Sequence, residues 1–200
     1  FPLLALPLFV YAGDLMKGGG ISSAIVDFIY SFIGRVKAAL GHVCILSCLF
    51  FGAISGSSAA TVAAIGGIMV PEMVAKGYKP SYAAALAASA GFLGILIPPS
   101  IPLVVYGISS SASIGALFLA GVGPGLVMGL AFMLINHFYS GRYLEGGQIS
   151  NSEVQQRISR SQITLRAVPA LIMPAIILGG IYSGVFTPTE AGAVSVIYAI

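Results

Sequence analysis

The chain has 200 residues, of which 58% are hydrophobic and only 8% charged, and its mean hydropathy is +1.00. Soluble domains carry about 25% charged residues, so this composition excludes an ordinary soluble domain and predicts an all-α polytopic membrane protein in a lipid bilayer. The formal net charge is +3. The basic residues gather in short connections, where they indicate orientation rather than nucleic-acid binding. Cys44 and Cys48 share one apolar run and predict neither a disulfide framework nor a metal site.

Residues 1–40 predict the end of one transmembrane helix followed by a helix on the membrane surface. The apolar run Leu3–Met16 continues into Lys17 and three glycines, as expected where a span ends. In the segment Ile21–Gly34 the apolar residues recur at helical spacing and the polar ones lie opposite, which predicts an amphipathic interfacial helix. Its apolar face consists of Ile21, Ile25, Phe28, Ile29 and Phe32, and Arg35 and Lys37 follow it.

Two short apolar segments then flank a polar interruption, Ser55-Gly-Ser-Ser58. Val43–Ile54 and Ala59–Met73 each fall short of the roughly 20 residues that a spanning helix needs. A re-entrant hairpin, which enters and leaves the membrane on one side, therefore fits this stretch best. It leaves Lys37, Lys76 and Lys79 together on that side, which we expect to be cytoplasmic.

The remainder of residues 41–140 predicts a broken transmembrane helix and a return helix. Tyr82–Tyr106 is long enough to cross the membrane once, through the interruption Ile97-Pro-Pro-Ser100. Ser109–Ser113 would form the turn on the far side, and Ile114–Phe138 would cross back. The polar stretch that follows, residues 141–167, contains Arg142, Arg157, Arg160 and Arg166, so we expect a cytoplasmic loop.

Residues 168–200 predict an outward crossing over Val168–Phe186 and the start of one more helix. Thr187, Pro188 and Glu190 have the spacing of a capping box with proline at the first helical position. Glu190 has two interpretations. An ionisable residue in a membrane segment can carry protons, but the capping box explains this glutamate without such a role, and we favour the cap.

The Ser55–Ser58 interruption is the first candidate site. Non-helical backbone in a membrane is tolerated only where protein buries it or where it lines a polar cavity. Carbonyls at the end of one half-helix could coordinate a cation, N–H groups at the start of the next could meet a carboxylate, and Ser55, Ser57 and Ser58 add hydroxyls. The alternative is a kink of small residues that lets helices approach closely.

The second candidate site is the Pro98-Pro99 pair, which removes two successive backbone donors. The carbonyls of Gly94 and Ile97 then lose helical partners and could face an ion, although a simple proline kink is the alternative. His42 lies at a segment boundary and is expected to be structural. The sequence has no catalytic constellation, phosphate-binding glycine loop or metal-ligand spacing, so it does not predict an enzyme.

Several stretches, in order along nearly the whole chain, resemble the large membrane subunit of tripartite ATP-independent periplasmic (TRAP) transporters. They are Gly13-Asp-Leu-Met16, Phe51-Gly-Ala-Ile-Ser-Gly-Ser-Ser58, Gly77-Tyr78, Ile97-Pro-Pro-Ser-Ile101, Pro124-Gly125 and Gly184-Val-Phe-Thr-Pro-Thr-Glu-Ala191. The resemblance implies half of an inverted-repeat, ion-transporter-like elevator fold in the bacterial inner membrane, with residues 41–140 in the first repeat and residues 168–200 at the start of the second repeat. The second hairpin of such a fold would lie beyond residue 200.

The resemblance also implies a function: sodium-driven import of small organic anions such as carboxylates. The implied partners are a small membrane subunit and a periplasmic binding protein that delivers the substrate. Sodium would be the coupling ion, with no other cofactor. Carried over by motif, a sodium site falls on Ser55, Ser57, Gly94, Ile97 and Pro99, and the substrate lies nearest Ser57, Ser58 and Ser100. The alternative from another class is a non-transporting scaffold or a channel-like pore.

Overall fold

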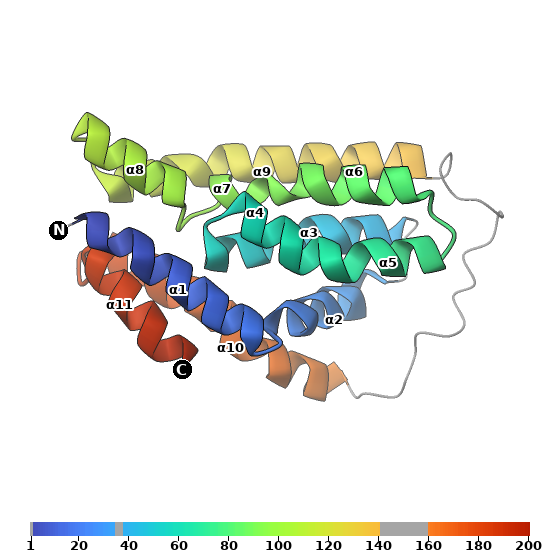
Figure 1. Ribbon diagram of the computed structural model, residues 1–200, viewed down its shortest axis with the longest axis horizontal. Helices are drawn as coiled ribbons and strands as arrows, with labels where there is room; N and C mark the ends of the chain where they lie inside the picture. The colour runs from blue at the N-terminus through green and yellow to red at the C-terminus, as the bar shows by residue number, and fades with distance from the viewer. Residues whose placement is uncertain (1, 35–37, 141–159) are drawn as a thin grey trace.

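A computed structural model describes residues 2–34, 38–140 and 160–200, and every regular element in these ranges is a helix (Figure 1). Arg35, Lys37 and most of the expected cytoplasmic loop, residues 141–159, lie outside the described residues. The helices are η1 (Pro2–Leu4), α1 (Ala5–Gly18), α2 (Ile21–Ile33), α3 (Ala39–Ser55), α4 (Ser58–Thr61), the π-helical segment η2 (Val62–Gly66), α5 (Gly67–Ala75), α6 (Pro80–Gly91), α7 (Leu93–Leu96), α8 (Ile101–Ser110), α9 (Ile114–Tyr139), α10 (Arg160–Tyr182) and α11 (Pro188–Ala199).

Helix α3 lies at the centre of the molecule. It contacts α1, α2, α6, α7 and α9, and nearly all of its residues are buried, including both cysteines. A helix that is apolar on every side is stable only when other helices surround it. From its end the chain turns at residues 56–57 and runs back beside α3 as α4, η2 and α5 (Figure 1). Residues 39–75 therefore form a helical hairpin.

The arms of this hairpin are longer than the sequence analysis expected. The first arm is Ala39–Ser55 rather than Val43–Ile54, and the second extends from Ser58 to Ala75 rather than from Ala59 to Met73. The second arm has 18 residues and satisfies the length and composition of a membrane span. At the tip, the predicted arms were too short because the serines there are helical. Ser55 is the last residue of α3, and Ser58 is the first residue of α4.

Where the sequence predicts the broken transmembrane helix, the structure has a bent pair of helices. The pair consists of Pro80–Leu96 and Ile101–Ser110 and is bent by 41° at the prolines. The two helices are long and apolar enough to cross a membrane only when they are taken together. Helix α9 then runs back past α8 and α7 and packs on α3, and many of its apolar residues are exposed. These include Leu119, Val127, Leu130 and Phe138. The described residues contain three candidate spans, which are Ser58–Ala75, Ile114–Tyr139 and Ile163–Tyr182. If the bent pair is one span, there are four.

The other layer consists of α1, α2, α10 and α11, which lie below the α3–α9 layer in Figure 1. Helix α1 packs against α11, and α10 packs against both α2 and α11. On the apolar face expected for α2, Ile25 and Ile29 are buried and Phe32 is exposed, while Ser22 of the expected polar side is also buried. The position of α2 on the membrane surface stays a prediction. The predicted capping box of α11 is also confirmed: Glu190 accepts hydrogen bonds from the backbone N–H and the hydroxyl of Thr187, both at 2.8 Å.

Candidate functional site

The turn at the tip of the hairpin depends on one glycine and two serines. Gly56 has a φ of 61°, a left-handed conformation that glycine adopts at little cost, and its N–H donates to the Gly52 carbonyl at 2.8 Å to close α3. Ser57 is extended and caps α4, because its hydroxyl accepts a hydrogen bond from the Ala60 N–H. The end of one helix and the start of the next are therefore only two residues apart.

Thr61 organises the oxygen atoms at this tip. It is fully buried, and both its N–H, at 3.0 Å, and its hydroxyl, at 2.8 Å, donate to the Ser57 carbonyl. The Thr61 hydroxyl also lies 3.1 Å from the hydroxyl of Ser55. Thr61 was not among the site residues predicted from the sequence. Its position four residues after the N-cap serine was the available signal, because a threonine hydroxyl commonly bonds the carbonyl four residues earlier.

The second interruption leaves several carbonyls without their usual helical donors. Pro98 and Pro99 have no N–H to offer the carbonyls of Gly94 and Ile95. The Ser100 hydroxyl replaces one of these donors, at 2.6 Å from the Ile95 carbonyl, and it also accepts from Leu103 N–H as the cap of α8. The Ile97 carbonyl lacks its helical donor for another reason, because the Ile101 N–H points to a different acceptor.

That acceptor is the Gly56 carbonyl, 3.1 Å from the Ile101 nitrogen, so the two interruptions are joined by a backbone hydrogen bond. Glycines make this approach possible. A Cβ on Gly56 would lie 2.6 Å from the Pro99 carbonyl oxygen, and one on Gly52 would lie 2.5 Å from the Gly94 Cα. A Cβ on Gly94 would lie 2.5 Å from the Thr61 hydroxyl and 3.0 Å from the Ser57 carbonyl oxygen. Larger residues at these positions would separate the two segments.

The fold thus brings together Ser55, Ser57, Gly94 and Pro99 of the predicted sodium ligands. Ile97 was predicted to act through its backbone carbonyl, which lacks its helical donor, while its side chain lies against Gly125 of α9. All the oxygen atoms at this junction belong to carbonyls and hydroxyls. Among the described residues, no three His, Cys, Asp or Glu side chains are grouped closely enough to hold a metal ion. Such neutral dipoles suit a monovalent cation, as in ion-channel filters, better than a proton or a divalent ion.

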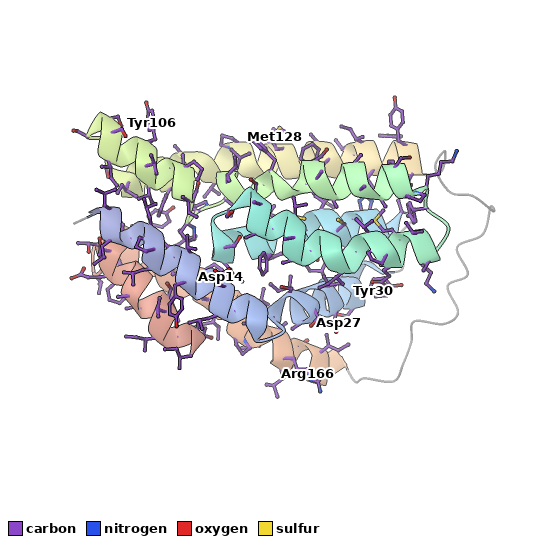
Figure 2. All side chains as sticks on the ribbon, viewed as in Figure 1. Asp14, Asp27, Tyr30, Tyr106, Met128 and Arg166 are labelled. Carbon is purple, nitrogen blue, oxygen red and sulfur yellow. The ribbon has the colours of Figure 1, made fainter. Side chains whose placement is uncertain are left out.

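Charged side chains lie in both layers, and in the hairpin layer they are Glu72 and Lys76 at the end of α5 and Lys79 at the start of α6. Figure 2 places Asp14, Asp27 and Arg166 on α1, α2 and α10. Asp14 is exposed, although the preceding residue, Gly13, packs against Ser55. Burial raises the pKa of Asp27, and the Arg166 guanidinium partly opposes that rise. The described tip and the Pro98-Pro99 segment therefore offer dipoles but no ionised group to a ligand.

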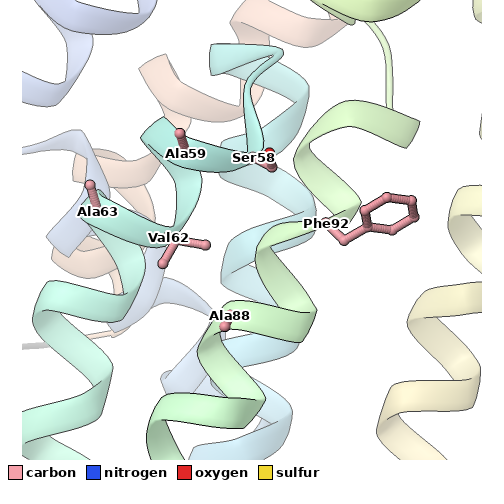
Figure 3. A pocket seen from close by; sticks show the side chains of 6 residues that line it. All are labelled: Ser58, Ala59, Val62, Ala63, Ala88 and Phe92. Atoms are coloured by element: carbon pink, nitrogen blue, oxygen red, sulfur yellow. The ribbon is translucent and has the colours of Figure 1, made fainter.

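A hollow of about 480 Å³ lies beside the start of the second arm, between α4–η2 and α6 (Figure 3). Its lining consists of Ser58, Ala59, Val62, Ala63, Ala88 and Phe92. Of the three residues predicted nearest the substrate, Ser58 lines this hollow and Ser57 is half-buried next to it. Ser100 is only 1% exposed, and its hydroxyl hydrogen is engaged by the Ile95 carbonyl.

Sequence comparisons show the family of this chain. Residues 1–200 match the family model described as the DctM component of the tripartite ATP-independent periplasmic transporter. The chain therefore belongs to the DctM family, the large permease component of TRAP transporters, and is a multi-pass membrane protein.

Similar curated proteins differ in the substrate that their names state. The chain is 42% identical to the isethionate TRAP transporter permease protein DctMQ of Oleidesulfovibrio alaskensis, over 100% of this chain and 31% of that protein. It is 41% identical to the C4-dicarboxylate TRAP transporter large permease protein DctM of Pseudomonas aeruginosa and to the sialic acid TRAP transporter large permease protein SiaM of Vibrio cholerae. Each of these two alignments covers 100% of this chain and 46% of the relative. The chain thus spans less than half the length of these relatives.

Proposed function

We propose that this chain forms the first repeat and the start of the second repeat of a sodium-driven importer of small organic anions in the bacterial inner membrane. The observation that supports this most directly is the junction of the two interruptions, where the Gly56 carbonyl accepts a hydrogen bond from Ile101 N–H. It gathers neutral oxygen atoms from Ser55, Ser57, Gly94 and Pro99 at the ends of half-helices, the arrangement by which secondary transporters hold coupling ions near the membrane midplane.

The sodium ion would be bound mainly by backbone carbonyls and the hydroxyls of Ser55 and Ser57. The hydrogen bond between the interruptions couples the hairpin tip to the broken helix, so in an elevator mechanism the two segments would move as one body. The N-terminus of α4, with the Ser58 hydroxyl beside it, would receive the carboxylate of the substrate. A small membrane subunit and a periplasmic binding protein would complete the transporter, as the tripartite family name indicates.

Uptake by the complete transporter in proteoliposomes tests this proposal. Isethionate, a C4-dicarboxylate and sialic acid, which the names of the relatives state, are suitable probes with a matching binding protein. We expect uptake to require an inward sodium gradient and to be insensitive to a pH gradient alone, because the junction has no titratable acceptor. Uptake that ignores both gradients would indicate a channel-like pore, and uptake driven by protons without sodium would refute sodium coupling.

The Ser57→Ala variant tests the ion site directly. Loss of one oxygen ligand should lower the apparent sodium affinity about fivefold, the effect of roughly 1 kcal/mol. Ser81→Ala, on the exposed face of α6, is the matched control and should leave the affinity unchanged. Undiminished uptake by Ser57→Ala at limiting sodium would remove Ser57 from the site.

The proposed re-entrant course of the hairpin makes a separate prediction, because both of its ends would then be cytoplasmic. A single cysteine at Lys76, which is half-buried just after α5, should resist a membrane-impermeant thiol reagent added from outside. Efficient labelling from the periplasmic side would show that Ser58–Ala75 crosses the membrane instead.

A further inference from the structure

The other end of the hairpin carries a buried polar cluster that the proposed ion site does not use. Asn136, near the end of α9, is fully buried. Its side-chain nitrogen lies 3.1 Å from the Ala38 carbonyl and 3.0 Å from His42 Nδ1, both at the start of α3. Its side-chain oxygen accepts from the Tyr82 hydroxyl of α6 at 2.9 Å. One amide therefore links three helices across 54 and 98 residues of sequence.

The donors and acceptors of this cluster can be assigned without ambiguity. The Ala38 carbonyl can only accept, so the Asn136 atom that faces it must be the NH2 group. That group has two hydrogens, one for Ala38 and one for His42, so His42 Nδ1 must be the acceptor. An imidazole that accepts at Nδ1 is neutral and carries its proton on Nε2. Protonated His42 would direct an N–H at the amide N–H and lose this bond.

The backbone around the cluster leaves room for it. A side chain at Gly41 would overlap the Asn136 amide, so the glycine admits Asn136 against α3. The ring of His137, next to Asn136 on α9, stacks on the ring of His42 with centroids 5.9 Å apart and planes 7° apart. Two stacked imidazoles cannot both carry a proton without repulsion, so this contact also favours neutral His42.

We propose that Asn136 is a positioning residue that holds the base of the hairpin on α6 and α9, and that this clamp closes only when His42 is neutral. The clamp is the set Ala38, His42, Tyr82 and Asn136. When it opens, the start of α3 is released from α9, while the backbone contact at the tip remains. The effect of acid on transport rests on the proposed function, but the existence of the clamp does not.

The direction of the pH effect follows from the surroundings of His42, which lies in the first turn of α3 and outside the candidate spans. Burial lowers the pKa of His42, and the neighbouring His137 lowers it further. The unfolded value is about 6.5. The clamp therefore contributes its full stability above about pH 6.5 and loses it as the pH falls below that value.

Other ionisable groups lie on the elements around α3. They include Tyr139 on α9, Lys79 and Tyr82 at the start of α6, Glu72 and Lys76 at the end of α5, Asp27 and Tyr30 on α2, Tyr11, Asp14 and Lys17 on α1, and Arg166 on α10. Within the described part of the chain, His137 is the group whose charge acts on the titration of His42. The test must therefore separate His42 from His137.

The experiment compares the complete permease with its partner subunit in wild-type form and as His42→Asn, at about pH 7.5 and about pH 5.5. An asparagine oxygen can replace Nδ1 as the acceptor but does not titrate. We expect the wild-type midpoint of thermal unfolding to fall by about 3 °C more than that of His42→Asn on acidification. In His137→Phe the midpoint of thermal unfolding should still fall on acidification, as it does in the wild type. Equal responses of wild type and His42→Asn would overturn the proposal.

Asn136→Ala should remove the clamp, so its unfolding midpoint should lie below that of the wild type at about pH 7.5 and approach it at about pH 5.5. If that variant does not assemble, Tyr82→Phe removes a single hydroxyl and should show a smaller loss in the same direction. A constant difference at both pH values would contradict the role of His42. Because these readouts are thermal, they remain valid even if sodium-driven uptake fails.

Discussion

At the tip of the hairpin, backbone atoms of two interrupted segments touch directly, whereas at its base long side chains bridge the helices. The tip is held by the Gly56–Ile101 hydrogen bond and by close glycine contacts, with no room for adjustment. The base is held by the side chain of Asn136, which is hydrogen-bonded to Tyr82 and to the Ala38 carbonyl. Packed backbone transmits displacement rigidly, while a side-chain network can open and close. The tip is therefore suited to fixed ligand geometry and the base to adjustment.

The largest expected effect is at the tip. In Gly94→Ala the new methyl group would lie 2.5 Å from the Thr61 hydroxyl, so the broken helix must move away from the hairpin. We expect at least a tenfold loss of uptake, since an error of about 1 Å in a binding site costs this much or more. Gly67→Ala is the control, because nothing lies within 4 Å of its Cβ. Normal uptake by Gly94→Ala would show that the two interruptions need not touch.

The matching change at the base should be milder. In Gly41→Ala the new methyl group would displace the Asn136 amide, which is a side chain rather than backbone. We expect a loss of about 1–3 kcal/mol in the free energy of unfolding, the typical cost of overpacking a filled site. Uptake should fall less than in Gly94→Ala. Gly123→Ala on α9, with open space around its Cβ, is the control. A Gly41→Ala variant more damaging to uptake than Gly94→Ala would reverse the comparison between the two ends.

The sequence predicted the tip better than the base, for a physical reason. Ser55-Gly-Ser-Ser58 and Pro98-Pro99 interrupt apolar runs, so helix breaks were visible locally, and the capping box at Thr187 was visible too. The atoms that the breaks bring together could not be predicted, because the Gly56–Ile101 hydrogen bond joins residues that are 45 positions apart in the sequence. No local sequence pattern marks Asn136, Tyr82 and His42. Their side chains form hydrogen bonds with one another only when α9 packs on α3.

The oxygen network at the tip can be weakened without changing its shape. Thr61→Val keeps the volume but removes the hydroxyl that donates to the Ser57 carbonyl and lies beside Ser55. The Thr61 N–H still donates to that carbonyl, so the loss is partial. We expect a decrease of about 1 kcal/mol in stability and about a fivefold weaker apparent sodium affinity. Thr61→Ser, which retains the hydroxyl, should stay close to the wild type in affinity. Identical affinities for the valine and serine variants would exclude Thr61 from organising the ion site.

The smallest effect is expected at Glu190, in the first turn of α11. Its carboxylate accepts from the backbone N–H and hydroxyl of Thr187, and these bonds lower its pKa below the usual value. The group is therefore ionised at neutral pH, and its cap is lost only as the pH falls through that lowered pKa. Glutamine can also complete a capping box, so Glu190→Gln should keep uptake within roughly twofold of the wild type. A proton carrier would behave differently, because an amide cannot carry the proton. Abolished uptake in Glu190→Gln, with normal assembly and thermal stability, would restore the proton-carrier interpretation and challenge the neutral ion site at the tip.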